Sequence, residues 1–291
     1  MEHVEAQLDA AKEGEHMNIG QIKVEYIDHM GDDLMVVNAA RTSFGKESDW
    51  ATNADGTYAG PTNHLKPEDA SLIRYLATGY RTKEWDEFLF EIIETVVSNT
   101  GSTTGVMTIK EELTALLHAY KRRAQHWAPF AHPHLSLRMK LPMFLARQFV
   151  KHQVGGVWSE ESRRYISDEP GVWFPDEWHT RPDDIKQGSG GLAHDQASCH
   201  MYAEMAVHTA LGEYNNLLKD GVAPEEARIV LPLNTMTTVT WTGSLLFWSR
   251  VCNQRMDSHA QLAAQELGRQ IADIVRPRYP VSWDALVGAP T

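Results

Sequence analysis

The sequence predicts an α+β fold in which strands and helices share one domain of 291 residues. Two short segments, 21–29 and 134–139, alternate apolar and polar residues, which is the period of a half-buried strand. Several longer segments carry apolar residues at helical spacing instead. No internal repeat and no evident linker divides the sequence, so we expect these elements to pack around a common core.

The first half of the chain is predicted to contain one strand and four helices, separated by a polar loop. Residues 45–66 are rich in Gly, Asn, Asp, Thr and Pro, a composition typical of a loop. Pro67 then starts a helix, because its fixed φ suits the first helical turn. The expected elements are the strand at 21–29 and helices at Leu34–Arg41, 67–77, 84–98 and 109–125.

The second half is predicted to alternate strands, helices and one long surface loop. Pro142 is expected in the first turn of a helix that runs to about Gln153 and ends at Gly155-Gly156. Residues 167–191 are rich in Pro, Gly and Trp and are expected to form the loop. The other expected elements are strands at 134–139 and 234–241, a connection at 229–232, and helices at about 192–219, 243–254 and 258–275.

Composition limits the classes of function. There are 39 acidic and 27 basic residues, and the formal charge of −12 argues against general binding of nucleic acid. It leaves room for a small anion held in a local basic pocket. No apolar run is long enough for a membrane span. Two cysteines cannot form a disulfide framework, and the acidic N-terminus does not resemble a secretion signal, so we expect a cytoplasmic location.

Residues 147–165 gather polar and cationic groups in this acidic chain. Residues four apart share a helix face, so Arg147 and Lys151 are expected to form a cationic stripe beside Gln148 and His152. Such a helix would pack on the core and present a polar edge to a ligand. The competing interpretation is a solvated helix face followed by a salt-bridged loop.

A second polar cluster follows the two glycines and ends in Ser162-Arg163-Arg164-Tyr165. Arginine offers bidentate donors to phosphate, and serine adds a hydroxyl. Ionised Glu160 can only accept, which suits a hydroxyl or ring N–H of a ligand. These three types of group together predict a pocket for a phosphate that carries a sugar and a base.

This segment resembles the signature of the flavin-dependent thymidylate synthases. The family pattern is Arg-His-Arg, seven residues and Ser, with Asn-Glu before the Ser and Arg-Tyr after it. Lys151-His152-Gln153 resembles the first part. The run from Ser159 to Tyr165 resembles the second part, one residue further on, in a form similar to phage-type members. Four further blocks resemble the family, at 38–44, 129–132, 227–234 and 255–261.

The resemblance implies one domain over 1–291 with a central, mainly antiparallel sheet flanked by long helices. It also implies a homotetramer whose active sites are shared between subunits. Segments at about 81–125 and 167–191 resemble insertions relative to compact members. The expected location is the cytoplasm, or the host cytoplasm if a phage encodes the protein.

The implied reaction transfers a one-carbon unit from methylene-tetrahydrofolate to C5 of dUMP and gives dTMP. FAD would be the cofactor, and NADPH would reduce it. The cofactors carry the difficult chemistry in such a scheme, so no protein nucleophile is needed. Cys199 and Cys252 are therefore expected to be inert thiols.

The resemblance also assigns roles to individual residues. Arg255 would be the catalytic residue, since its charge would polarise the pyrimidine ring. Arg228 would reach the phosphate from a neighbouring subunit. The residues expected to bind the nucleotide are Gln148, Lys151, Glu160, Ser162, Arg163, Arg164, Arg228 and Arg255. The residues expected to bind flavin or folate are His132, His134, Lys151, His152, Gln153, Glu160, Ser244 and Arg250.

Several positions depart from the family pattern. Ser244 and Arg250 stand where the family usually has asparagines beside the flavin, and Gln153 stands where it has arginine. Ser159 replaces an asparagine, and Leu262-Ala263-Ala264 replaces Trp-Glu-Ile. These departures leave open a flavin-dependent hydroxymethylation of dUMP or dCMP. They also leave open a nucleotide-binding protein without catalytic activity.

Fourteen histidines raise the hypothesis of a metal site. His132-Pro-His134 and the series His194, His200 and His208 are the candidates. Neither group has the spacing of a His-Glu-x-x-His or paired-cysteine site. We therefore expect no metal, and a zinc hydrolase is the most distant alternative.

Overall fold

In the computed structural model, the centre of the fold is a four-stranded antiparallel sheet with the strand order β1-β2-β4-β3. The structure describes residues 17–52, 65–79, 87, 90–92, 94, 126–182 and 188–288. The strands are β1 (Lys23–Met30), β2 (His134–Pro142), β3 (Gly156–Glu160) and β4 (Met236–Ser244). The prediction of an α+β fold with an antiparallel sheet is confirmed.

The two central strands, β2 and β4, show why one face of the sheet is buried. Successive side chains of a strand point to opposite faces, and every second residue of β2 is apolar. Four of these side chains are almost fully buried: Leu135, Leu137, Met139 and Leu141. The register of β4 adds Val239 and Trp241 to the same face. The opposite face carries polar residues and is more accessible.

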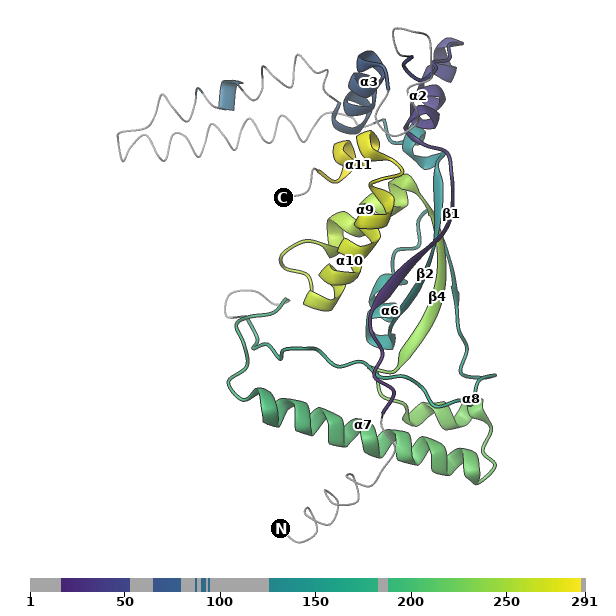
Figure 1. Cartoon of the computed structure of the whole chain (residues 1–291), viewed down its shortest axis with the longest axis vertical. Helices are drawn as coiled ribbons and strands as arrows, with labels where there is room; N and C mark the ends of the chain where they lie inside the picture. Colours follow the sequence, from purple (N-terminus) through teal and green to yellow (C-terminus); the bar gives the residue numbers. More distant parts are fainter. Residues whose placement is uncertain are drawn as a thin grey trace, which may run out of the picture.

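Helices α6 (Met143–Phe149), α9 (Leu245–Arg255) and α10 (Leu262–Val275) contribute to the apolar core with the sheet (Figure 1). Its centre is aromatic. Trp241 makes edge contacts with Trp248 at 5.1 Å between ring centroids and with Phe247 at 4.8 Å. Large buried aromatic side chains contribute strongly to a core, so this cluster fixes α9 against β4.

Figure 1 shows three helices together at one end of the sheet: α2 (Asp33–Arg41), α3 (Pro67–Thr78) and α11 (Pro280–Leu286). Asp33 is buried and accepts hydrogen bonds from the backbone N–H groups of Val281 and Ser282, at 2.8 and 2.9 Å. A residue near the start of α2 therefore holds the first turn of α11. Short 3-10 helices complete this end at η1 (Thr42–Phe44) and η2 (Ala128–Ala131).

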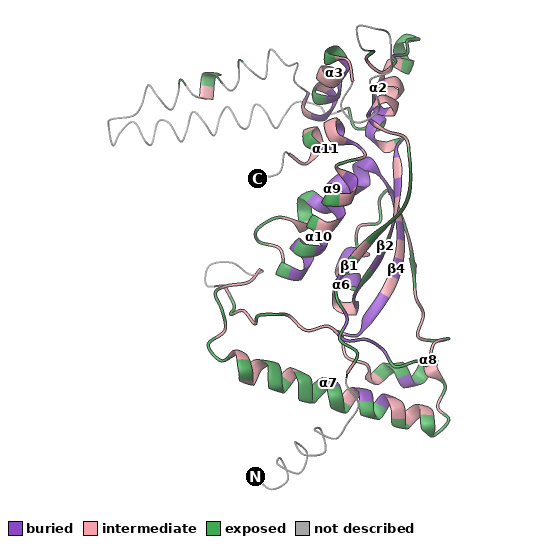
Figure 2. Cartoon of the chain, in the orientation of Figure 1, coloured by how far each residue is buried: buried purple, intermediate pink, exposed green. Residues whose placement is uncertain are grey.

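Helix α7 (Gln196–Lys219) lies at the other end of the sheet, beside α8 (Pro224–Ala227) and η3 (Arg228–Val230). Figure 2 shows that the N-terminal half of α7 is mostly exposed. Its buried residues lie from the middle of the helix onward and are Val207, Leu211 and Tyr214. The first two pack with Val172 in a small separate core.

The structure corrects the predicted course of the chain around 150. The helix ends at Phe149 and not near Gln153, so Lys151 and His152 do not share a helix face with Arg147 and Gln148. The glycine pair does not simply end a helix. Gly155 adopts a positive φ of 90°, and β3 starts at the next residue to pair with β4.

Strand β3 and helix α11 were not predicted. Residues 167–191 lack a named helix or strand within their described part, as expected, but they are not wholly superficial. Val172 is buried and bridges to Ile19 and Thr235. The helices predicted at 84–98 and 109–125 lie almost entirely outside the described residues.

Candidate functional site

The predicted polar segment surrounds the turn between α6 and β3, and Arg255 reaches it from the last turn of α9. Nε of Arg255 donates a hydrogen bond to Nε2 of His152 at 3.0 Å. Nη2 donates to the backbone carbonyl of Gln148, also at 3.0 Å. The guanidinium lies 5.4 Å from the centre of the Phe149 ring. Residues 103 positions apart in sequence thus form one cluster.

The contact between His152 and Arg255 fixes the protonation of the imidazole. A guanidinium can only donate, so Nε2 of His152 must be unprotonated and its proton must lie on Nδ1. Burial, and then the charge of Arg255, lower the pKa of His152 below its usual range. The cluster therefore keeps a neutral imidazole beside a guanidinium that retains its positive charge.

A cavity of about 700 Å³ opens beside Arg255. Its lining is formed by Gln148, the loop residues Gly188 and Ser189, and the segment 253–261 apart from Met256 and Ser258. Oε1 of Gln148 is buried and has no hydrogen-bond partner among the described residues. A buried acceptor without a partner costs about 1–3 kcal/mol, so a turn of the Gln148 side chain that lets this oxygen meet an N–H in the cavity would be favoured.

Glu160 ends β3 with its carboxylate held on both sides. Oε1 accepts from the hydroxyl of Thr237 at 3.1 Å, and Oε2 accepts from the indole of Trp158 at 3.2 Å. A smaller cavity of about 420 Å³ adjoins this residue and is also lined by Arg138 and Ser159. The bonds to neutral donors orient the Glu160 carboxylate but leave its negative charge in place.

Arg163 and Arg164 are adjacent in sequence but differ in their contacts. Arg163 donates to the carbonyl of Asp168 at 2.5 Å and lies 3.8 Å from the carboxylate of Glu161. Arg164 is exposed, and its Nε lies 3.2 Å from the hydroxyl of Ser162. Arg163 thus closes its own turn, whereas the Arg164 side chain is accessible to an anion.

The remaining predicted residues are more dispersed. Nδ1 of His134 lies 2.8 Å from the carbonyl of His132, where β2 begins. Ser244 is buried and caps α9, since its hydroxyl accepts from the N–H of Phe247 at 3.2 Å. The other predicted residues of this group are exposed, namely His132, Lys151, Gln153, Arg228 and Arg250. Nε of Arg228 donates to the backbone carbonyl of Glu225 at 3.1 Å.

A larger cavity, of about 1010 Å³, was not predicted from the sequence apart from His132 in its lining. It lies between α2, α3, η1 and η2. Arg41 and Lys46 bring positive charge to it, and Tyr75 and His126 bring aromatic rings. These residues come from separate segments and follow no spacing motif, which is why sequence reasoning missed the cavity.

Two further observations concern the hypotheses on metal and membrane. In the parts of the chain that the structure describes, no three residues among His, Cys, Asp and Glu are grouped so as to hold a metal ion. The same parts contain no helix with the length and apolar character that crossing a bilayer requires.

Residues 25–281 match the family described as thymidylate synthase complementing protein. The flavin-dependent thymidylate synthase of Thermus thermophilus is 33% identical over 181 residues, which are 62% of this chain and 66% of that relative. The chain thus covers slightly less than two thirds of that relative. The enzyme of the same name from Kosmotoga olearia is 34% identical over 167 residues, 56% of this chain and 71% of the relative.

A longer alignment joins the chain to the flavin-dependent thymidylate synthase of Wolbachia pipientis wMel, with 25% identity over 97% of this chain and 79% of the relative. Among solved structures, a UMP/dUMP methylase from Streptomyces cacaoi, bound with 5-Br dUMP, has the same fold. Its TM-score is 0.63 at 23% identity, over 91% of this chain and 94% of that chain. The family match extends over most of the sequence, and this chain belongs to the thymidylate synthase complementing protein family.

Proposed function

We propose that this protein is a flavin-dependent thymidylate synthase, which transfers a one-carbon unit from methylene-tetrahydrofolate to C5 of dUMP. The observation that carries the proposal is the cluster of Arg255, His152 and Gln148 at a cavity. The names of the relatives support it, and so does the ligand of the Streptomyces neighbour, a halogenated dUMP.

In the proposed nucleotide site, each polar side chain is assigned a contact that matches its ability to donate or accept hydrogen bonds. The Gln148 side chain would turn toward the cavity, so that Oε1 accepts from the N–H of the pyrimidine ring and gains the partner it lacks. Arg255 would place its charge beside the ring and stabilise negative charge that develops there. The phosphate would bind to Arg164, Lys151 and Ser162, with Arg163 holding the turn.

The other predicted nucleotide contacts follow the same logic. Glu160 would accept from a hydroxyl or ring N–H of the nucleotide or the flavin. Arg228 would act from a neighbouring subunit, in keeping with its exposure and its distance in sequence from the cluster.

The donor and acceptor set near the start of β2 and α9 fits a flavin. His132, His134 and His152 are aromatic and can donate or accept, and Ser244 retains a hydroxyl proton after capping α9. Exposed Gln153 and Arg250 add an amide and a cation that suit the outer part of the cofactor. FAD would supply the hydride when bound, and NADPH and methylene-tetrahydrofolate would be co-substrates.

We also propose a homotetramer in the cytoplasm, or in the host cytoplasm if the gene belongs to a phage. Large apolar side chains in and around β3 and in η3 are unusually exposed for a single subunit. The most exposed of them are Val154 (79%), Val157 (71%), Tyr165 (77%) and Ile229 (80%). Contacts between subunits would cover them.

The deciding experiment is mass analysis of the nucleotide after incubation with methylene-tetrahydrofolate, FAD and NADPH. dUMP and dCMP are tested separately. A gain of a methyl group on dUMP supports the proposal. A gain of a hydroxymethyl group supports the second candidate, which the changed residues Gln153, Ser244 and Arg250 favour. An unchanged nucleotide that still binds tightly would replace both with a binding protein that lacks activity.

A further inference from the structure

Two short segments of the loop before α7 pair with each other through backbone hydrogen bonds. The N–H of Thr180 donates to the carbonyl of Gly191 at 2.7 Å, and the N–H of Gly190 donates to the carbonyl of Thr180 at 2.9 Å. We call residues 178–180 together with 190–193 the paired segment. Mutual bonds of this kind satisfy backbone groups in a part of the chain that has no named helix or strand, and they order it.

Gln196, the first residue of α7, joins the paired segment to that helix. Its Oε1 accepts from the N–H of Trp178 at 2.7 Å. Its Nε2 donates to the carbonyls of Trp178, at 2.7 Å, and of Ala193, at 2.9 Å. A side-chain amide can accept and donate at once, so one residue satisfies three backbone groups. Gln196 therefore fixes where the paired segment lies relative to α7.

The paired segment continues directly into the cavity beside Arg255. Gly188 and Ser189 immediately precede Gly190, and both line that cavity of about 700 Å³. Ser189 is half-buried, and its hydroxyl can donate or accept a hydrogen bond. Because the paired segment resumes at the next residue, it determines where this hydroxyl lies. Gln196 itself does not line the cavity.

The lining of the cavity suits a neutral polar ring. It contains one arginine and one carboxylate, Arg255 and Asp257, and the imidazole of His259 lies 2.9 Å from that carboxylate. Amides and hydroxyls can match the carbonyl and N–H groups of a pyrimidine, and a few such groups fix the orientation of a ligand. The lining residues with an amide or hydroxyl side chain are Gln148, Ser189, Asn253, Gln254 and Gln261.

We propose that Ser189 contacts the pyrimidine ring in this cavity and that Gln196 is a positioning residue for it. The inference rests on the proposed function, because it takes dUMP as the ligand of the cavity. Ser189 directs its hydroxyl to a polar edge of the base. Gln196 acts through the backbone bonds of the paired segment, so a residue of α7 influences the affinity of a site that it does not touch.

Two adjacent glycines provide a matched pair of variants. A Cβ at Gly190 would lie 2.6 Å from the hydroxyl oxygen of Thr180 and 3.0 Å from the carbonyl oxygen of Arg181, so Gly190→Ala should displace the pairing. A Cβ at Gly191 meets nothing within 4 Å, so Gly191→Ala is the control. Calorimetric titration of the purified full chain with dUMP measures both. We expect about 2–10-fold weaker binding in Gly190→Ala, through loss of one hydrogen bond to the base, and a change below about twofold in Gly191→Ala.

A double-mutant cycle separates positioning from general damage. Ser189→Ala and Gln196→Met should each weaken dUMP by about 2–10-fold. The double variant should bind no more weakly than the weaker single variant, because Gln196 acts through the contact that Ser189→Ala has already removed. Losses that multiply in the double variant would mean that Gln196 supports the structure in general, and would remove the positioning role.

Asp195→Ala is the control for the start of α7. The Asp195 carboxylate caps the helix by accepting from the N–H of Ser198 at 2.9 Å, and it does not line the cavity. This variant should unfold at a lower urea concentration and keep its affinity for dUMP. Equal weakening of dUMP by Asp195→Ala or by Gly191→Ala would overturn the proposal. So would unchanged affinity in Ser189→Ala or in Gly190→Ala, or failure of the original protein to bind dUMP.

Ser189 belongs to no named helix or strand, so Ser189→Ala decides the matter even if Gln196→Met does not fold. The proposed function fails separately. Binding of dUMP without any methylated product would refute that function and leave the comparison of affinities readable. Methylated product with unchanged affinity in every variant would refute only the roles of Ser189 and Gln196.

Discussion

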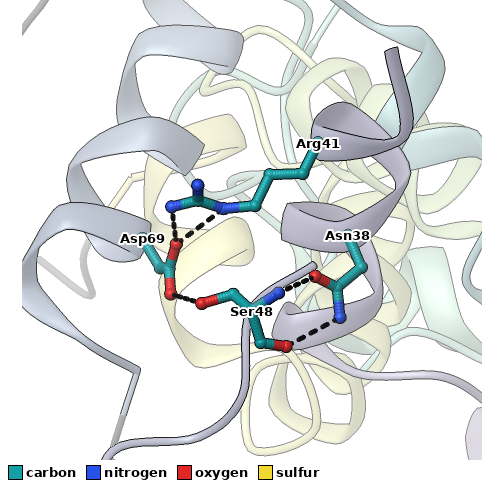
Figure 3. A network of polar contacts seen from close by, with 4 residues as sticks. All are labelled: Asn38, Arg41, Ser48 and Asp69. Carbon is teal, nitrogen blue, oxygen red and sulfur yellow. Dashed lines mark hydrogen bonds and ion pairs between the residues drawn. The ribbon is translucent and has the colours of Figure 1, made fainter. Parts of the chain in front are cut away.

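Arg41 and Arg164 differ in what neutralises their charge. Arg41 is paired with the buried carboxylate of Asp69, and that pair joins two helices (Figure 3). Among the described residues, the Arg164 side chain contacts the hydroxyl of Ser162 and the ring of Tyr165, and it forms no ion pair with a carboxylate. An arginine with an internal acidic partner stabilises the fold, whereas one without such a partner keeps its charge available for an anionic ligand.

Arg255 shows an intermediate arrangement. Its partners are a neutral imidazole and a backbone carbonyl, which fix the direction of the guanidinium without neutralising it. Burial lowers its pKa but leaves it protonated at any physiological pH. Hydrogen bonds to uncharged acceptors thus give a site both an ordered cation and a strong local field. The three arginines can be tested against one another.

The largest effect on stability is expected from Asp69→Ala. The substitution leaves Arg41 partly buried without its counter-ion, and breaking a buried pair in this way costs about 3–5 kcal/mol. Urea denaturation should show that loss in the free energy of unfolding. Glu204→Ala, which removes an exposed carboxylate from α7, is the control and should change it by less than about 0.5 kcal/mol. A loss below about 1 kcal/mol at Asp69 would mean that Arg41 is not dependent on its internal partner.

The largest effect on activity is expected from Arg255→Ala. Removing a preorganised charge from a developing anion lowers the rate by about 10²–10³. The rate of dTMP formation at saturating dUMP measures it. Arg255→Lys should not restore the rate, because an ammonium cannot reproduce the two directed bonds to His152 and Gln148. Lys219→Gln serves as a control for the loss of a surface cation. A rate within threefold of the original protein would exclude Arg255 from the reaction.

Much of the fold could be predicted because its signals are local. The alternation of apolar and polar residues in β2 predicted that strand, and Pro67 marked the start of α3. Strand β3 was missed since its five residues contain a glycine and a mixed pattern, and they become a strand only by pairing with β4. Helix α6 also ends earlier than predicted, at Phe149, and the sequence from 150 to 153 does not indicate that end.

The candidate site shows the same difference between residues that the sequence indicates and contacts that form only on folding. Gln148, His152 and Arg255 were identified through the family resemblance, and the structure places them in contact. The cavity beside Arg41 was missed because four segments meet there only after folding. Arg163 was grouped with Arg164 in the sequence, but its contacts with Glu161 and Asp168 separate the two.

The comparison of Arg163 with Arg164 gives a third prediction. Arg164→Ala should weaken the affinity for dUMP about 10–100-fold, by loss of a charged hydrogen bond to phosphate, and leave unfolding unchanged within about 0.5 kcal/mol. Arg163→Ala should destabilise the protein by about 1 kcal/mol, because the turn loses its bond to Asp168. Calorimetry and urea denaturation report the two quantities. Unchanged dUMP affinity in Arg164→Ala would refute the phosphate clamp.

The smallest expected effect is a dependence of dUMP affinity on pH. It tests the hydrogen bond between Arg255 and His152. Burial and the charge of Arg255 lower the pKa of His152 below its ordinary value of 6.5. As pH falls below that value the unfolded chain binds a proton that the folded state resists, so the stability from neutral His152 declines. Once the pH falls through the lowered pKa, protonation sets two cations together and removes the acceptor for Arg255.

Affinity for dUMP should therefore decrease on acidification from pH 7.5 to 5.5, by less than about tenfold, which corresponds to 1.4 kcal/mol. His152→Asn keeps an acceptor but cannot titrate, so its affinity should depend less on pH over this range. Arg255 keeps its proton over this range, whereas the phosphate of dUMP takes one up near pH ~6 in both proteins, so the difference between the two pH profiles reports on His152. Calorimetric titration with dUMP at several pH values measures both proteins. Parallel pH profiles would show that the bond between His152 and Arg255 does not control the orientation of the guanidinium.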